Sequence, residues 1–154
     1  MEYLIVKMLH ILSSTFLFGT GVGTAFFLLF TSLSKNVAAV ATVSRLVVRA
    51  DWLFTATTVV FQPLSGLYLM HLAGMPMSSR WIVWSFALYA LAIACWLPVV
   101  WLQMQLRDVA AAAALEHQPL PRRYWRLLGA WVALGFPALF AFLAIFYLMV
   151  ARPL

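Results

Sequence analysis

The sequence predicts an all-α transmembrane four-helix bundle. Of its 154 residues, 66% are hydrophobic and only 9% are charged, and the mean hydropathy is +0.99. A chain of this composition cannot bury its apolar surface in one water-soluble core. A helix needs roughly 20 apolar residues to cross the hydrocarbon layer. Four segments meet that length within a single domain of residues 1–154: residues 3–31, 52–72, 81–103 and 127–150.

The first apolar segment, residues 3–31, begins without the basic start of a secretory signal and continues too far for one, so we expect it to remain as a helix. Within it, Gly19 and Gly23 have the spacing that permits close approach of two helices. We expect a packing groove there, inside the bundle or between protomers of a homo-oligomer. The alternative is that this glycine face leaves room for a flat ring system.

The loop between the first two segments has apolar residues at helical spacing, which predicts a short amphipathic helix lying on the cytoplasmic membrane surface. Arg45 and Arg49 lie one turn apart on another face of that helix. Like charges at this spacing repel unless an anion lies between them. We expect a lipid phosphate there, and an anionic ligand is the alternative.

The third segment is followed by the five alanines of residues 110–114. Alanine is the best helix former, so this helix is expected to continue into the cytoplasm until Pro119 and Pro121 end it. Pro63, Pro98 and Pro137 lie within the last three segments. Each proline frees a backbone carbonyl that another group must satisfy. These prolines either bend the helices around a cavity or are ordinary packing kinks.

The basic residues predict the orientation in the membrane. Most of them lie in or beside the two long connections, and fewer lie on the other side. The positive-inside rule then places both termini outside, an N-out, C-out topology for a multi-pass protein of the bacterial inner membrane. The net charge of +6 therefore indicates orientation and contact with anionic membrane lipid, and not nucleic-acid binding.

Two histidines are candidate ligands. His10 lies inside the first segment, where an imidazole needs a partner, and His71 ends the second segment at the same outer face. Two histidines at similar depth in a four-helix bundle can ligate a haem iron, with Lys7 and Arg80 near the propionates. The residues alone leave three roles open for His10: haem ligand, hydrogen-bonded packing histidine, or proton relay or other ligand site.

The positions of the acidic residues disfavour one class of membrane protein. Asp51 and the three other carboxylates are expected near or outside the membrane interfaces, with Asp51 as a counter-ion for Arg49. A proton-coupled transporter normally uses carboxylates within the membrane, so this class is disfavoured. Cys95 is the single cysteine, which leaves no thiolate cluster for zinc or iron.

Over nearly its whole length the chain resembles a bacterial family of small predicted integral membrane proteins of unknown function. The resemblance rests on residues 7–12 (KMLHIL), 18–27 (FGTGVGTAFF), 48–54 (VRADWLF), 62–66 (QPLSG) and 95–103 (CWLPVVWLQ). More distantly, the Lys-x-Leu-His-Ile start and the four-helix layout resemble the haem-containing membrane protoporphyrinogen oxidases. That resemblance implies haem b on His10, although residues 81–85 lack the lysine of those enzymes.

These observations predict a protein that binds haem b and takes part in membrane electron transfer or porphyrin oxidation, with quinone or porphyrin as partner. As an enzyme it would be a haem-dependent oxidoreductase. One alternative is a non-catalytic accessory or assembly subunit of a larger membrane complex. The other is a small-molecule transporter module with Gln62, Pro63 and Gln103 along a pore.

Overall fold

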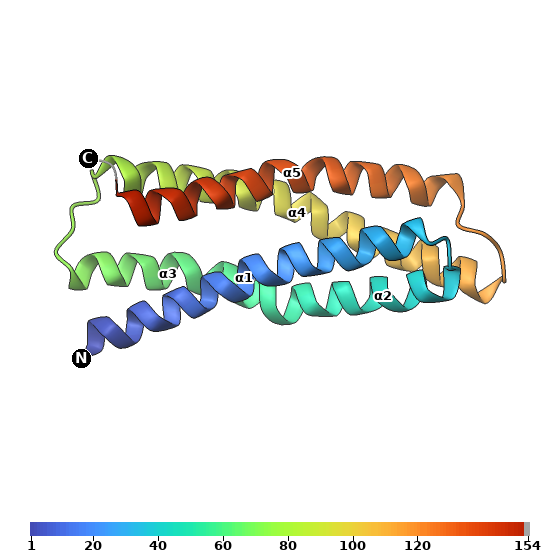
Figure 1. Ribbon diagram of the computed structural model, residues 1–154, viewed down its shortest axis with the longest axis horizontal. Helices are drawn as coiled ribbons and strands as arrows, with labels where there is room; N and C mark the ends of the chain where they lie inside the picture. The colour runs from blue at the N-terminus through green and yellow to red at the C-terminus, as the bar shows by residue number, and fades with distance from the viewer. Residues whose placement is uncertain (153–154) are drawn as a thin grey trace.

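The computed structural model describes residues 1–152, and within them the regular structure is entirely helical. The elements in chain order are α1 (Glu2–Leu33), α2 (Val37–Ala50), the π-helical turn η1 (Asp51–Thr55), α3 (Ala56–Leu72), α4 (Arg80–Leu115) and α5 (Arg122–Ala151). Figure 1 shows an elongated bundle with both termini and the α3–α4 connection at one end. The prediction of an all-α, four-helix chain is confirmed, since α2, η1 and α3 form one long helix.

Three helices, α1, α4 and α5, are each long and apolar enough to cross a membrane. The fourth, α3, has 17 residues. Because η1 precedes α3 in the same helix, the apolar length of this arm extends to about that of the predicted segment 52–72. The multi-pass character expected from the sequence is therefore confirmed.

The amphipathic helix differs from its prediction. It does not lie apart on the membrane surface, because Ala50 and Thr55 both keep right-handed helical angles and join α2 to α3 through η1. Asn36 begins α2 by accepting a hydrogen bond from the backbone N–H of Ala39 at 3.1 Å. The apolar face of α2 packs against α1 and α4. The helical spacing of its apolar residues was predicted correctly. The apolar face was expected to lie on the membrane, but it packs against other helices of the protein.

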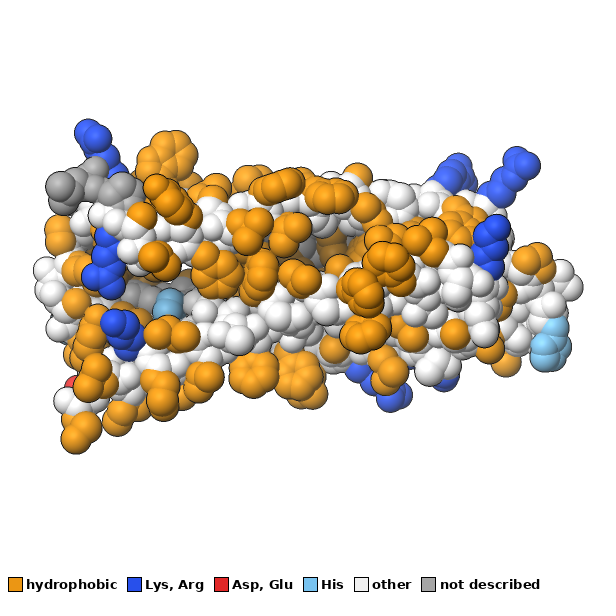
Figure 2. Space-filling view, in the orientation of Figure 1, with side chains coloured by type: hydrophobic (Ala, Val, Ile, Leu, Met, Phe, Trp, Pro, Cys, Tyr) orange, Lys and Arg blue, Asp and Glu red, His pale blue; other side chains and the backbone are white. Residues whose placement is uncertain are grey.

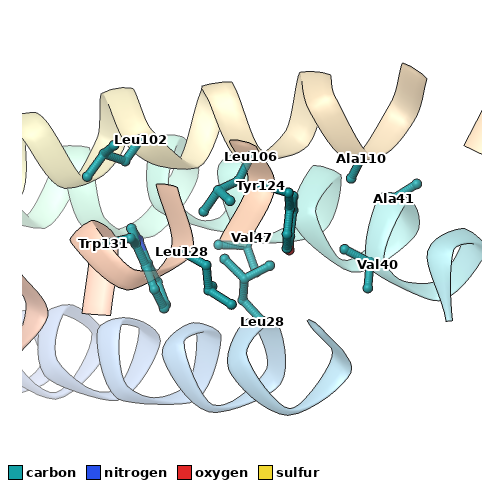
Figure 3. Packing of buried hydrophobic residues seen from close by; sticks show 10 residues of the cluster. All are labelled: Leu28, Val40, Ala41, Val47, Leu102, Leu106, Ala110, Tyr124, Leu128 and Trp131. Atoms are coloured by element: carbon teal, nitrogen blue, oxygen red, sulfur yellow. The ribbon is translucent and has the colours of Figure 1, made fainter. Parts of the chain in front are cut away.

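A hydrophobic core lies where α2 meets the ends of the other helices, far from the termini (Figure 3). At its centre, Tyr124 is fully buried and its hydroxyl is 2.6 Å from that of Ser32, which donates to the carbonyl of Leu28. This pair joins α5 to α1. The core consists of Leu28, Val40, Ala41, Val47, Leu102, Leu106, Ala110, Tyr124, Leu128 and Trp131.

The extension of α4 is part of this core. As predicted, α4 continues through the alanines and ends at Leu115, before Pro119. Ala110 and Leu106 are completely buried against the core. The small alanine side chains let α2 pack beside α4, so the extension holds the bundle together in addition to lengthening it.

Toward the other end, the bundle separates into two pairs, α1 with α3 and α4 with α5, which form the two layers of Figure 1. Tyr89 of α4 reaches across to α3 and donates to the carbonyl of Val59 at 2.6 Å. This carbonyl lies four residues before Pro63, whose ring nitrogen cannot bond to it. The expectation that a neighbouring group satisfies a proline-freed carbonyl is therefore confirmed for Pro63.

The predicted packing role of Gly19 and Gly23 inside the bundle is wrong. A Cβ at either residue would meet no atom within 4 Å, so no helix of this chain approaches closely there. The close approach occurs at Gly66 of α3, where a Cβ would lie 3.3 Å from Cε1 of His10. Contact between protomers through Gly19 and Gly23 remains a prediction.

The charged residues leave an apolar middle. Figure 2 shows lysine and arginine near the two ends of the bundle and along one edge, with hydrophobic side chains between them. The two termini lie at the same end, as the N-out, C-out topology requires. Which end faces the cytoplasm remains a prediction from the positive-inside rule.

Replacing Leu106 by alanine should destabilise the protein by about 3 kcal/mol, because it leaves a cavity in the core. Leu106 is fully buried, whereas Leu115 on the same helix is 82% exposed. Leu115→Ala should therefore change the free energy of unfolding by less than about 0.5 kcal/mol. Denaturant unfolding of both variants in the same detergent measures the difference, and equal effects would contradict the assignment of this core.

Candidate ligand site within the bundle

His10 is a partly buried residue of α1 that faces α3. Its Nδ1 lies 2.7 Å from the hydroxyl of Ser65, and its Nε2 lies 3.1 Å from the amide nitrogen of Gln62. Ser65 directs its one hydroxyl proton to the carbonyl of Phe61 at 2.8 Å, so it accepts from Nδ1–H. The Gln62 amide nitrogen is only a donor, so Nε2 accepts. With the Gln62 amide in this orientation, the network fits the tautomer with the proton on Nδ1, and the buried Oε1 of Gln62 has no partner within the described residues.

His71 is exposed and lies on another side of α3. At 3.6 residues per turn, it is about 120–180° around the helix from the residues that His10 contacts. His10 packs on one side of α3 and His71 lies on another side, so the two imidazoles cannot approach opposite faces of a single porphyrin. Of the predicted propionate partners, Lys7 lies 5.8 Å from the centroid of the Tyr3 ring, and Arg80 is exposed at the start of α4.

The residues around His10 do not fit a haem. Both ring nitrogens are hydrogen-bonded to α3, and an iron at Nε2 would have to replace Gln62. A Cβ at Gly66 would lie 3.3 Å from Cε1 of His10, so the imidazole packs directly against α3. The geometry matches the hydrogen-bonded packing histidine, one of the three roles that the sequence left open.

Arg45 and Arg49 are both exposed on α2, away from its buried face. Arg45 donates from Nε to the carbonyl of Ala41 at 3.3 Å. The predicted ion pair between Arg49 and Asp51 is not among the salt bridges of residues 1–152. Binding of an anionic lipid or ligand by the two arginines remains a prediction.

A cavity of about 290 Å³ lies between the helix pairs, beside the hydrophobic core. All four long helices contribute to its wall, and most of the lining is apolar. Gly21 of α1 and Gly135 of α5 line it without side chains, and a Cβ on either would meet nothing within 4 Å. The alternative interpretation of the glycine face, that missing side chains leave space, therefore describes Gly21 better than close helix packing does.

The polar part of the lining comes from the π-helical turn and from α4. Asp51 is 4% exposed and accepts a hydrogen bond from Thr55 at 2.9 Å. Gln103 of α4 is buried as well and lines the same cavity. Asp51 was expected near or outside the interface, and the burial of its side chain corrects that prediction. Asp51 and Thr55 continue the buried face of α2 at intervals of three and four residues after Val48, which places both on the inner side of the helix.

Three residues that line the cavity each carry a buried polar atom without a hydrogen-bond partner within the described residues. These atoms are Oε1 of Gln103, Nε1 of Trp131 and Nε1 of Trp96. Gln103 is 3% exposed and Trp131 is 6% exposed, so bulk water does not supply the missing hydrogen bonds. Buried polar atoms are rarely unpaired, and three around one cavity mark it as a candidate ligand site.

Sequence reasoning missed most of this site. Trp96 and Gln103 are seven residues apart, which is two helical turns and therefore one face of α4. That spacing was visible, but the sequence did not show that α5 would place Trp131 beside it. Among residues 1–152, no three His, Cys, Asp or Glu side chains group together as a metal site. The cavity's chemistry is therefore hydrogen bonding in apolar surroundings.

Gly66→Ala should lower stability by about 1 kcal/mol relative to Gly129→Ala. Alanine normally stabilises a helix over glycine, but at Gly66 its Cβ would crowd His10, whereas at Gly129 it would meet nothing within 4 Å. In a His10→Ala background the Gly66→Ala penalty should vanish. A double-mutant cycle of unfolding free energies measures the coupling. Additive effects would show that His10 does not pack on α3.

Titration of the purified protein with haemin should give no Soret shift that depends on His10, because both of its ring nitrogens have protein partners. His10→Ala and the control His117→Ala, which changes an exposed histidine, should have the same visible spectra. A band lost only in His10→Ala would establish axial ligation and overturn the packing role.

Comparison with known proteins gives the family but no activity. A family model described as "Predicted integral membrane protein (DUF2269)" matches residues 4–153. No curated protein and no solved structure matches the chain, and nothing in these comparisons supports the distant resemblance to the haem-containing oxidases. With nearly its whole length matched, the chain belongs to the DUF2269 family of predicted integral membrane proteins.

Proposed function

We propose that this protein binds a small, largely apolar molecule of the membrane in the cavity between its helix pairs. The observation that carries the proposal is the presence of three unpartnered buried polar atoms around one apolar cavity of about 290 Å³. Small-molecule sites are usually apolar pockets of roughly this size or larger with a few polar groups that fix orientation. An unpaired buried group costs about 1–3 kcal/mol, which a ligand can recover.

The lining supports entry from the bilayer. Val22 and Phe26 of α1 and Phe136 of α5 line the cavity and are also exposed on the outer surface. These residues lie on the two helices that face each other across the layers in Figure 1, and Figure 2 shows a recess between the layers. A lipid-soluble molecule would pass between α1 and α5 without entering water.

The position of the hydrophobic core favours a ligand-binding site over a transport pore. Trp131 belongs both to the cavity wall and to the core cluster, so tightly packed side chains follow directly beyond that part of the wall. A transport pore would have to continue through this cluster. The proposal therefore places a largely apolar ring compound in a closed-ended site, in a protein of the bacterial inner membrane.

Electron transfer through haem b is not part of this proposal, because the surroundings of His10 do not fit the group. The accessory-subunit alternative agrees with a binding role, since a protein without catalytic machinery can hold a ligand for a partner. No described contact favours a specific partner complex.

Filling the cavity should abolish binding. Naphthalene is a suitable probe because it is apolar, rigid and small, and binding to the native state raises the unfolding midpoint. Gly21→Phe places a ring in the cavity and should reduce the naphthalene-induced shift at least about tenfold. Gly19→Phe is the matched control, since Gly19 is on the same helix but does not line the cavity.

The measurement is the unfolding midpoint in detergent micelles, with and without naphthalene. Wild type and Gly19→Phe should show the same shift. A shift in wild type that persists unchanged in Gly21→Phe would mean that naphthalene acts through the micelle or another surface, and the proposed site would be wrong.

A further inference from the structure

We propose that the ligand carries a hydroxyl group, which donates its proton to Oε1 of Gln103 and accepts a hydrogen bond from Nε1 of Trp131. This inference rests on the proposed binding function and names the chemical class: a phenol, a quinol or a lipid alcohol. A quinone or a plain hydrocarbon lacks the proton that this site requires.

The orientation of the Gln103 amide determines what is missing. In the structure, Oε1 of Gln103 is buried and has no hydrogen-bond partner within the described residues. An amide oxygen can be satisfied only by a donor, and the apolar side chains that dominate the lining provide none.

Trp131 supplies the second half of the pattern. Its indole nitrogen is a donor without a described acceptor. Trp131 packs in the core cluster with Leu102 and Leu106, which flank Gln103 in sequence. Gln103 and Trp131 both line the cavity, and one hydroxyl oxygen placed between them can serve both the donor and the acceptor.

Trp96 lies further along the cavity. It is seven residues from Gln103, which is about 10 Å along the helix axis at 1.5 Å per residue. One hydroxyl cannot reach both Gln103 and Trp96. The indole of Trp96 is then available to an acceptor at the far part of the ligand, which a second oxygen of a quinol would supply.

The test uses three probes with the same ring system: 2-naphthol, 2-methoxynaphthalene and naphthalene. Their dissociation constants are measured from unfolding midpoints in detergent, corrected for the partition of each probe into micelles. We expect 2-naphthol to bind about tenfold more tightly than the other two probes, because only it donates a proton to Gln103. The methoxy group retains the oxygen and removes the donor.

Gln103→Met is the main variant, since it keeps the side-chain length and removes the amide oxygen. It should reduce the preference for 2-naphthol to less than about twofold while naphthalene still binds. Gln118→Met changes an exposed loop glutamine and should keep the full preference. Trp131→Phe removes only the indole donor and should weaken 2-naphthol more than naphthalene, so it serves as a second test if Gln103→Met does not fold.

The outcomes separate the two proposals. Equal binding of all three probes in wild type would overturn the hydroxyl requirement, with a water molecule as the partner of Gln103, and would leave the cavity as an apolar binding site. Binding of none of the three would overturn the proposed function itself. A preference for 2-naphthol that survives both Gln103→Met and Trp131→Phe would place the hydroxyl elsewhere and also reject the inference.

Discussion

The structure depends on the need to satisfy polar groups where the surroundings offer no water. Along α1 and α3, threonine hydroxyls turn back to carbonyls of their own helix, as Thr24 does to Thr20 at 2.8 Å and Thr58 to Phe54 at 2.6 Å. Between helices, His10 bonds to Ser65 and Tyr89 bonds to Val59. These contacts join elements that apolar packing alone would not orient, because lipid competes equally for apolar surface.

The two ends of the bundle are stabilised by different interactions. Around Leu106 and Tyr124, the helices form a dense core like that of a water-soluble protein. Toward the termini, the helices separate into two pairs, which the hydrogen bond from Tyr89 to the carbonyl of Val59 connects. The cavity lies beside the core, between these pairs. The hydrophobic core at one end and the separated helix pairs at the other can keep the cavity open, because closing it would require the core to repack.

The exceptions to polar satisfaction indicate function more clearly than the satisfied groups do. His10 attracted attention in the sequence, but each of its ring nitrogens has a protein partner. Gln103 and Trp131 attracted less attention, yet their buried polar atoms lack one within the described residues. The unpartnered atoms of Gln103 and Trp131 support the proposed binding role.

The sequence by itself determined the elements of this protein: its membrane nature, its four helices, the length of α4 and the partner that Pro63 requires. Each follows from hydropathy, helix propensity or a missing N–H, which are local properties of the chain. The tertiary structure decided what each helix face meets. Only packing placed α2 on α4 instead of on the membrane, turned Asp51 inward at a π-helical turn and placed Trp131 and Gln103 in the wall of one cavity. These outcomes depend on which surfaces fit together across the bundle, and a periodic pattern identifies a face without identifying its neighbour.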